Sequence, residues 1–86
     1  MAIAVFFEFP DESIEKYDQA LAEVPDLRAQ PARTHHICFK TDNGWGVVDV
    51  WDSEESFGKF GEVLAPTLQK FGLQAEPKIR PVHNIM

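Results

Sequence analysis

The sequence is poor in the features that mark several classes of protein. Its 86 residues include one cysteine, Cys38, so no disulfide can form within the chain, as is typical of a reducing compartment such as the cytoplasm. No apolar run reaches 18 residues, so we expect no membrane span. Eight Lys and Arg stand against 14 Asp and Glu, and no basic run is present. The net charge of −6 argues against nucleic acid and anionic membranes as partners.

Motifs for cofactors and for common hydrolases are also missing. The chain has no GxGxxG, P-loop, CxxC pair or GxSxG, so nucleotide binding and serine hydrolysis are not supported. His35, His36 and His83 lack HxH or HxxxH spacing, and the first two point to opposite faces of a strand. Residues 2–9 are too short for a signal peptide and include Glu8. We therefore expect no signal peptide, no metal and no cofactor.

What the chain has in abundance is aromatic side chains. Seven Phe and two Trp in so short a chain predict a packed single domain, residues 1–86. They also predict a second burial surface, which would be a dimer interface or a ligand cavity.

The hydrophobic pattern predicts the order βαββαβ. The predicted strands are Ala2–Phe9, Arg33–Lys40, Gly46–Trp51 and Glu76–Asn84, and the predicted helices are Asp11–Val24 and Ser53 to Val63 or beyond. Asp11 and Asp52 are the expected N-caps of the helices, and Asn43-Gly44 is the expected hairpin turn with positive φ. Pro66 should kink the second helix or begin a new turn, and Gly72 should end it. Two right-handed crossovers then give a four-stranded antiparallel sheet, order 4-1-3-2, with both helices on one face. This is a ferredoxin-like α+β sandwich. The prolines of the last strand place it at a sheet edge.

Period-two alternation sorts the strand residues into two faces. In the first strand the apolar set is Ile3, Val5, Phe7 and Phe9, which we expect against the helices. In the hairpin we expect Ile37, Phe39, Val48 and Val50 on that same side. The opposite face then carries His36, Cys38, Lys40, Trp45, Val47, Asp49 and Trp51. A monomer would leave this aromatic face exposed to water, so we expect a homodimer with Trp51 and Val47 near the centre of its interface.

The chain resembles the antibiotic-biosynthesis-monooxygenase-like group of the dimeric α+β barrel superfamily. The resemblance lies in Gly44-Trp45-Gly46-Val47-Val48-Asp49-Val50-Trp51, in the pattern Trp51-x-Ser53-x-x-x-Phe57-x-x-Phe60, and in Leu64-Ala65-Pro66. It implies a homodimer with facing sheets, and activities that include cofactor-independent oxidation of aromatic polyketides, haem degradation and isomerisation. Haem degraders carry an Asn on the first strand, which this chain lacks, and a Trp and a His that align with Phe60 and Lys70. Haem degradation is therefore disfavoured.

His36 and Asp49 form the candidate chemical pair, because they share a face on adjacent strands. A carboxylate that orients an imidazole tunes a general base, and a structural hydrogen bond at a dimer interface is the alternative. We expect His36, Asp49 and His83 as candidate catalytic residues.

A cavity between the sheet and the helices would bind a small hydrophobic ligand through Tyr17, Trp51 and Phe60. Two functions follow: a cofactor-independent monooxygenase-like enzyme acting on a small aromatic molecule, or a non-catalytic protein that binds a ligand or dimerises. Core packing is the alternative for Tyr17, interface packing for Trp51, and packing is the favoured role of Cys38.

Overall fold

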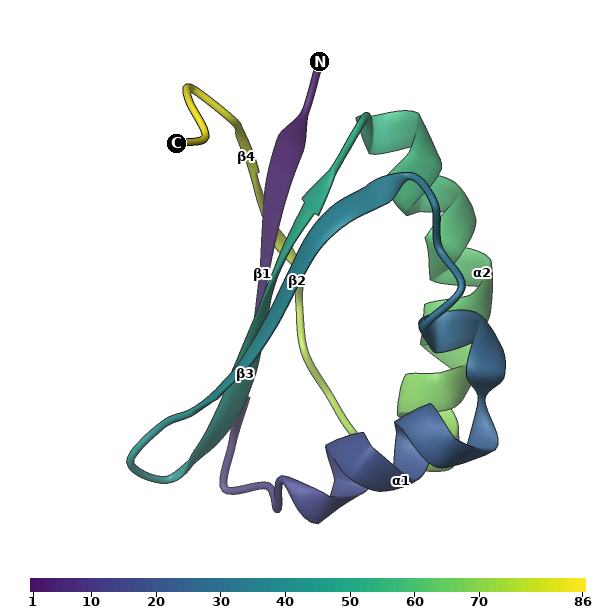
Figure 1. Cartoon of the computed structure of the whole chain (residues 1–86). Coiled ribbons are helices and arrows are strands. Elements are labelled where there is room, and N and C mark those ends of the chain that lie inside the picture. Colours follow the sequence, from purple (N-terminus) through teal and green to yellow (C-terminus); the bar gives the residue numbers. More distant parts are fainter.

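The computed structural model describes the whole chain, residues 1–86, and has the predicted βαββαβ order. Its elements are β1 (Ile3–Pro10), α1 (Glu15–Glu23), a 3-10 turn η1 (Pro25–Leu27), β2 (Arg33–Lys40), β3 (Gly44–Trp51), α2 (Glu54–Lys70) and β4 (Lys78–Pro81). The four strands form one antiparallel sheet in the order β2-β3-β1-β4, which is the predicted order counted from the other edge. Both helices lie on one side of the sheet (Figure 1), and the ferredoxin-like α+β fold is confirmed. Neither helix is long and apolar enough to cross a bilayer.

The face assigned to the β2–β3 hairpin is the opposite of the predicted one. In β3, Trp45 and Trp51 are buried under the helices, whereas in β2 Ile37 keeps 59% of its surface exposed. The cause is the pairing with β1: Ile3 lies opposite Trp51, and Phe9 opposite Trp45. Directly paired residues share a face, so the apolar face of β1 carries the Trp side of β3 with it against the helices.

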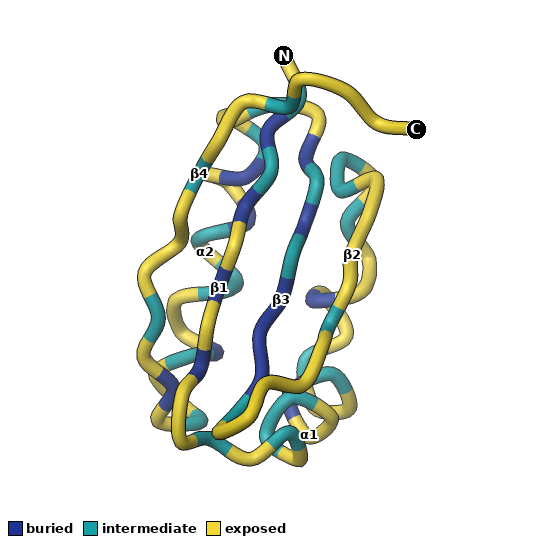
Figure 2. The backbone as a smooth tube through the Cα atoms, turned by 90° about the vertical axis from the view of Figure 1, so that its left-hand side faces the viewer, coloured by how far each residue is buried: buried dark blue, intermediate teal, exposed yellow.

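We call the helix-packed side of the sheet the covered face and the other side the open face. The covered face presents Ile3, Val5, Phe7, Phe9, Trp45, Val47, Asp49 and Trp51, all buried. The open face presents Phe6, Ile37, Phe39, Val48 and Val50, all exposed or half-buried. Figure 2 looks onto the open face, where the edge strands β2 and β4 are mostly exposed and β1 alternates between buried and exposed residues. Val47 and Trp51 therefore belong to the core of one chain, so the prediction that they form a dimer centre is wrong.

Both helices begin later than predicted. Asp11 has a left-handed φ of 60° and its N–H donates to the carbonyl of Asn43 at 2.9 Å, so it belongs to the turn after β1 and does not cap α1. The cap of α2 is Ser53, whose hydroxyl accepts from the Ser56 N–H at 3.1 Å, and not Asp52. The carboxylate of Asp52 instead accepts from the Ser56 hydroxyl at 2.6 Å.

Helix α2 and strand β4 end at or beside glycine and proline residues. Helix α2 continues without a break through Pro66 to Lys70, and Gly72 follows it with a φ of 66°, as predicted for a helix stop. Strand β4 is shorter than predicted and lies at a sheet edge, as expected for a strand with prolines at its ends.

The hairpin turn differs from the expected type. Neither Asn43 nor Gly44 has positive φ. Gly44 is required for space, because a Cβ there would lie 2.1 Å from the carbonyl oxygen of Phe9. The turn is closed by a hydrogen bond from the Thr41 N–H to the Gly44 carbonyl at 2.9 Å. The sequence therefore signalled the turn correctly, for a different physical reason.

Candidate functional site

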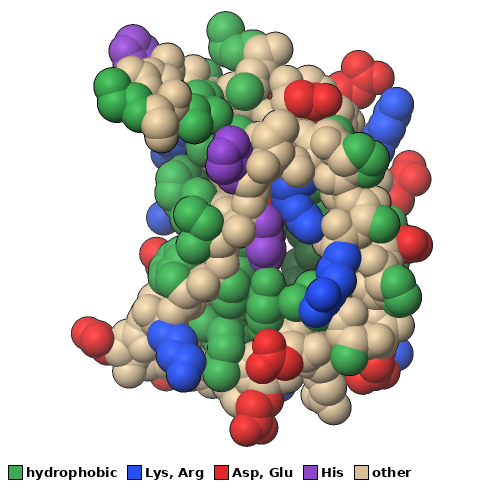
Figure 3. All heavy atoms as spheres, viewed as in Figure 1, with side chains coloured by type: hydrophobic (Ala, Val, Ile, Leu, Met, Phe, Trp, Pro, Cys, Tyr) green, Lys and Arg blue, Asp and Glu red, His purple; other side chains and the backbone are tan.

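A cavity lies between the covered face of the sheet and the two helices. The cavity has a volume of about 70 Å³ within about 580 Å³ of empty space that includes its open mouth. Twelve of its 16 lining residues are hydrophobic, so it suits an apolar ligand. Figure 3 shows the molecule hollowed here, with a His side chain beside the opening and Lys or Arg side chains across from it.

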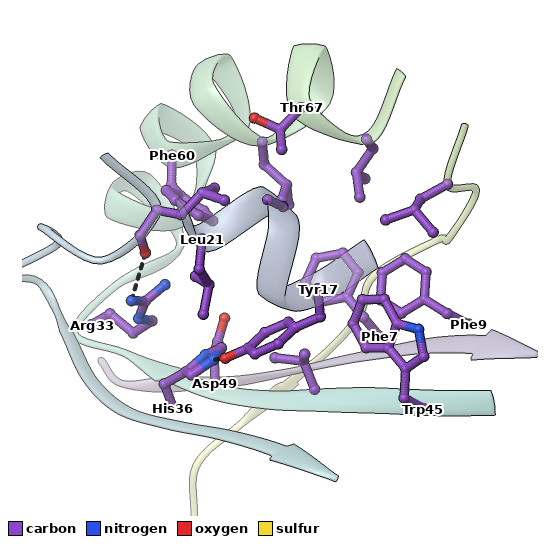
Figure 4. A pocket seen from close by; sticks show the side chains of 16 residues that line it. Phe7, Phe9, Tyr17, Leu21, Arg33, His36, Trp45, Asp49, Phe60 and Thr67 are labelled. Carbon is purple, nitrogen blue, oxygen red and sulfur yellow. Dashed lines mark hydrogen bonds and ion pairs between the residues drawn. The ribbon is translucent and has the colours of Figure 1, made fainter. Parts of the chain in front are cut away.

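Three polar side chains form a hydrogen-bonded line in the wall of this cavity (Figure 4). The Asp49 carboxylate meets Nδ1 of His36 at 2.5 Å, and Nε2 of His36 meets the Tyr17 hydroxyl at 2.7 Å. The Asp49 side chain is 3% exposed, whereas that of His36 is 28% exposed. The line therefore runs from a buried carboxylate to a partly open imidazole.

The fold places each member of this line from a different element. His36 on β2 lies directly opposite Asp49 on β3, and Asp49 in turn lies opposite Val5 on β1, in the middle of the sheet. Tyr17 comes from α1 and stacks nearly parallel to the His36 ring, with an interplanar angle of 7°. Tyr17 also packs edge-to-face with Trp45, with ring centroids 5.4 Å apart. The predicted His36–Asp49 contact is thus present, within one chain and facing the helices.

The hydrogen bonds define the proton positions that a neutral imidazole would take. A carboxylate only accepts, so Nδ1 of His36 donates to Asp49, and Nε2 is left as an acceptor for the Tyr17 hydroxyl. Burial raises the pKa of Tyr17 above its ordinary value of 10.0, Cys38 and Asp49 raise it further, and Arg33 and Arg28 act in the opposite direction. The phenol is therefore protonated at neutral pH and donates to His36.

Arg33 is a site residue that the sequence analysis missed. It lies opposite Trp51, while His35 lies opposite Val50, so Thr34 is an extra residue in β2 at this point. This bulge places both Arg33 and His36 on the covered face, although simple alternation would put residues three apart on opposite faces. A Thr between a basic residue and a His is not in itself a bulge signal, so the bulge could not be predicted from the residues alone.

The other predicted site residues are placed in three different surroundings. Phe60 lines the cavity with Tyr17. Trp51 does not line the cavity; it is fully buried and packs edge-to-face with Phe57, with ring centroids 5.8 Å apart. His83 lies on the open face, beside Phe6 and Val50 in a shallow depression, and so on the other side of the sheet from His36.

Cys38 is the remaining reactive side chain near the site. Cys38 shares the covered side through its pairing with Val47, and burial raises the pKa of its thiol, with Asp18 adding to the effect. A protonated thiol is a poor nucleophile, in keeping with a packing role. The structure holds no group of three or more His, Cys, Asp or Glu side chains that could bind a metal ion.

Comparison with known proteins finds solved structures with the same fold. No protein-family model matches the sequence, and no curated protein matches it. Among solved structures, SnoaB, a cofactor-independent oxygenase from Streptomyces nogalater, is 14% identical over 99% of this chain and 94% of its own, with a TM-score of 0.67. NE2512 of Nitrosomonas europaea, a protein of unknown function, is 15% identical over 99% and 92% of the two chains, with a TM-score of 0.73.

A third structure carries the family name suggested by the sequence. It is a candidate antibiotic biosynthesis monooxygenase from Deinococcus radiodurans, 7% identical over 100% of this chain and 96% of its own, with a TM-score of 0.63. Identities this low establish the fold alone. The chain therefore has the fold of SnoaB and of the Deinococcus radiodurans structure, in agreement with the fold that the sequence resemblance implied.

Proposed function

We propose that this protein is a cofactor-independent oxygenase that acts on a small aromatic molecule with an acidic C–H or O–H group, and that His36 is its general base. The observation that carries the proposal is the Asp49–His36–Tyr17 line in the wall of an apolar cavity. The structural likeness to SnoaB, whose name describes a cofactor-independent oxygenase, supports the reaction class.

The geometry suits proton abstraction at Nε2 of His36. This nitrogen accepts from the Tyr17 hydroxyl at 2.7 Å, so a substrate entering through the mouth replaces or extends that hydrogen bond. Asp49 holds the ring through Nδ1 and stabilises the imidazolium that forms when the proton is taken. The apolar walls exclude water and strengthen both interactions.

Removal of the proton leaves a carbanion or phenolate whose electrons can reduce dioxygen directly. For an activated CH₂ group, a C–O bond forms to give a hydroperoxide. The proton on His36 completes this hydroperoxide. His36 then takes the second C–H proton and passes it to the hydroxide that leaves as the O–O bond breaks, so that a ketone and water remain. The balance is CH₂ + O₂ → C=O + H₂O, so no external reductant is consumed.

Oxygen uptake with anthrone-type and quinol substrates tests this proposal. The wild type should consume dioxygen and, with an anthrone-type substrate, form one carbonyl per dioxygen, and His36→Gln should lower kcat by about 100-fold or more, the usual contribution of a general base. His35→Gln is the matched control, because that neighbouring ring lies opposite Val50 on the open face. Saturable binding without turnover would instead support the non-catalytic ligand-binding function.

We also propose that the protein is a homodimer formed through the open face. Phe6, Val48 and Ile37 form a row across three strands, since each is paired with its neighbour in the sheet. Phe6 is 40% exposed and Ile37 59% exposed, which makes this row the apolar surface that the fold leaves uncovered. A two-fold contact there would bury this row and leave the cavity free on the other side of the sheet.

We also propose a cytoplasmic location, because the single cysteine fits a reducing compartment.

A further inference from the structure

The guanidinium group of Arg33 is held rigidly at one end of the cavity. Its carbon lies 5.8 Å from the ring centroid of Trp51 and 5.7 Å from that of Phe60, so two aromatic faces support it. One of its nitrogens, Nη2, donates to the carbonyl of Leu27 at 2.7 Å. The backbone of η1 therefore fixes the direction in which the fork points.

Most of the hydrogen-bonding capacity of Arg33 is unused. The guanidinium has five N–H donors, and Leu27 is its one protein acceptor. Arg33 is in no ion pair, and Asp49, the one carboxylate on the covered face of the sheet, is already bonded to His36. Figure 4 shows the Arg33 side chain on the same side of the cavity as His36 and Asp49.

The bulge at Thr34 shows that the fold itself brings Arg33 to this site. Without the extra residue, Arg33 and His36 would lie on opposite faces of β2, and the cation would point away from the cavity. Bulges occur next to active sites, where they re-aim a side chain. Here the bulge places a cation and a base side by side in an otherwise apolar cavity.

We propose that Arg33 binds an anionic oxygen on the ligand, so that the cavity selects aromatic acids, carrying a carboxylate or a phenolate, over neutral aromatics of the same shape. This inference rests on the proposed ligand site and names its substrate class. The planar fork suits two oxygens of a carboxylate, and it also suits the oxyanion that appears when His36 removes a phenolic proton. The charge of Arg28 lowers the pKa of Tyr17, as that of Arg33 does, and so adds to the positive field at the Tyr17 hydroxyl.

Calorimetric titration with 2-naphthoate and 2-naphthamide tests the proposal, because the two probes match in shape and differ in charge. The wild type should bind the carboxylate at least about tenfold more tightly, the usual effect of a charged hydrogen bond. Arg33→Gln should reduce that preference to about one, with the Kd of the amide within about twofold of wild type. Arg33→Lys should keep part of the preference, because it retains the charge without the fork.

The matched control is Arg80→Gln. Arg80 also donates to a backbone carbonyl, that of Ile79, but lies opposite Ala4 on the open face, so its loss should leave both affinities unchanged. Equal binding of the two probes by the wild type, an intact preference in Arg33→Gln, or no saturable binding of either probe would overturn the anion site. Failure of dioxygen uptake with an intact charge preference would reject the oxygenase proposal and support the anion site.

Discussion

The two faces of the sheet are both apolar in sequence, yet they differ sharply in the structure. Along β3, Trp45, Val47 and Trp51 are buried beneath the helices, while Val48 and Val50 on the other side are half-buried. The covered face also contains the one buried carboxylate, Asp49, and the open face has none. The face that looks more polar in sequence is thus the better buried one.

The difference shows how large side chains outweigh a single charge. Burying a Trp-sized side chain contributes roughly 2–3 kcal/mol, and β3 carries two of them on the same face. One carboxylate on that face opposes burial, but its hydrogen bond to His36 offsets the cost. Asp49 is therefore tolerated in the core because a neighbouring strand supplies its partner, and that same contact forms the candidate site.

The largest expected effect is that of Trp51→Ala on the covered face. Trp51 is fully buried, so its truncation should lower the free energy of unfolding by about 3–5 kcal/mol. Urea unfolding followed by circular dichroism measures this. Val47→Ala and Val48→Ala form a matched pair on opposite faces, and Val47→Ala should cost clearly more at low protein concentration. A larger loss for Val48 would contradict the assignment of the two faces.

A charged substitution on the open face should weaken dimerisation. Ile37→Glu places a carboxylate in the middle of the exposed apolar row and should weaken dimerisation by about 100-fold or more, because a buried unpaired charge is costly. Sedimentation at micromolar concentration should change from about twice the 9.8 kDa chain mass to the mass of one chain. Gln69→Glu on the exposed surface of α2 adds the same charge and should leave the dimer intact. A wild-type monomer would reject this interface.

Most of the fold could be predicted from the sequence, because the signals are local. The Val- and Trp-rich run of β3, the Ser53 region before α2 and the stop at Gly72 each depend on a few neighbouring residues. Which face of the hairpin meets the helices could not be decided in this way. Alternation shows which residues share a face, and only the register between β1 and β3 shows which face is covered.

The candidate site could be predicted only where it depends on local pairing. The His36–Asp49 contact follows from pairing within one hairpin, and Tyr17 was a candidate through its place on α1. Arg33 could not be found, because its orientation depends on a bulge that alternation does not reveal. His83 was a candidate by residue type alone, and the short β4 carries the chain past the sheet edge to the open face.

A smaller effect on stability is expected from His36→Ala. This change leaves the carboxylate of Asp49, only 3% exposed, without its imidazole partner. An unpaired buried acceptor should cost about 1–3 kcal/mol at neutral pH, measured by urea unfolding. His35→Ala, on the open face of the same strand, should stay within about 0.5 kcal/mol of wild type. Equal effects of the two substitutions would show that the His36–Asp49 contact does not stabilise the fold.

The smallest effect concerns Tyr17 and alkaline pH. Burial, the largest cause, raises the pKa of the Tyr17 phenol in the folded protein above its ordinary value of 10.0, which the unfolded chain retains. Between these two values the folded state holds more protons than the unfolded state, so the free energy of unfolding falls as pH rises through and above 10. Tyr17 is the only tyrosine, so Tyr17→Phe removes the contribution of the phenol to the pH dependence of stability and leaves the lysine titrations in place. Urea unfolding from pH 8 to pH 11 should therefore show a shallower loss of stability for Tyr17→Phe than for the wild type. Parallel curves for the two proteins would mean that the phenol ionises equally readily in both states, which would contradict its placement in a desolvated cavity wall.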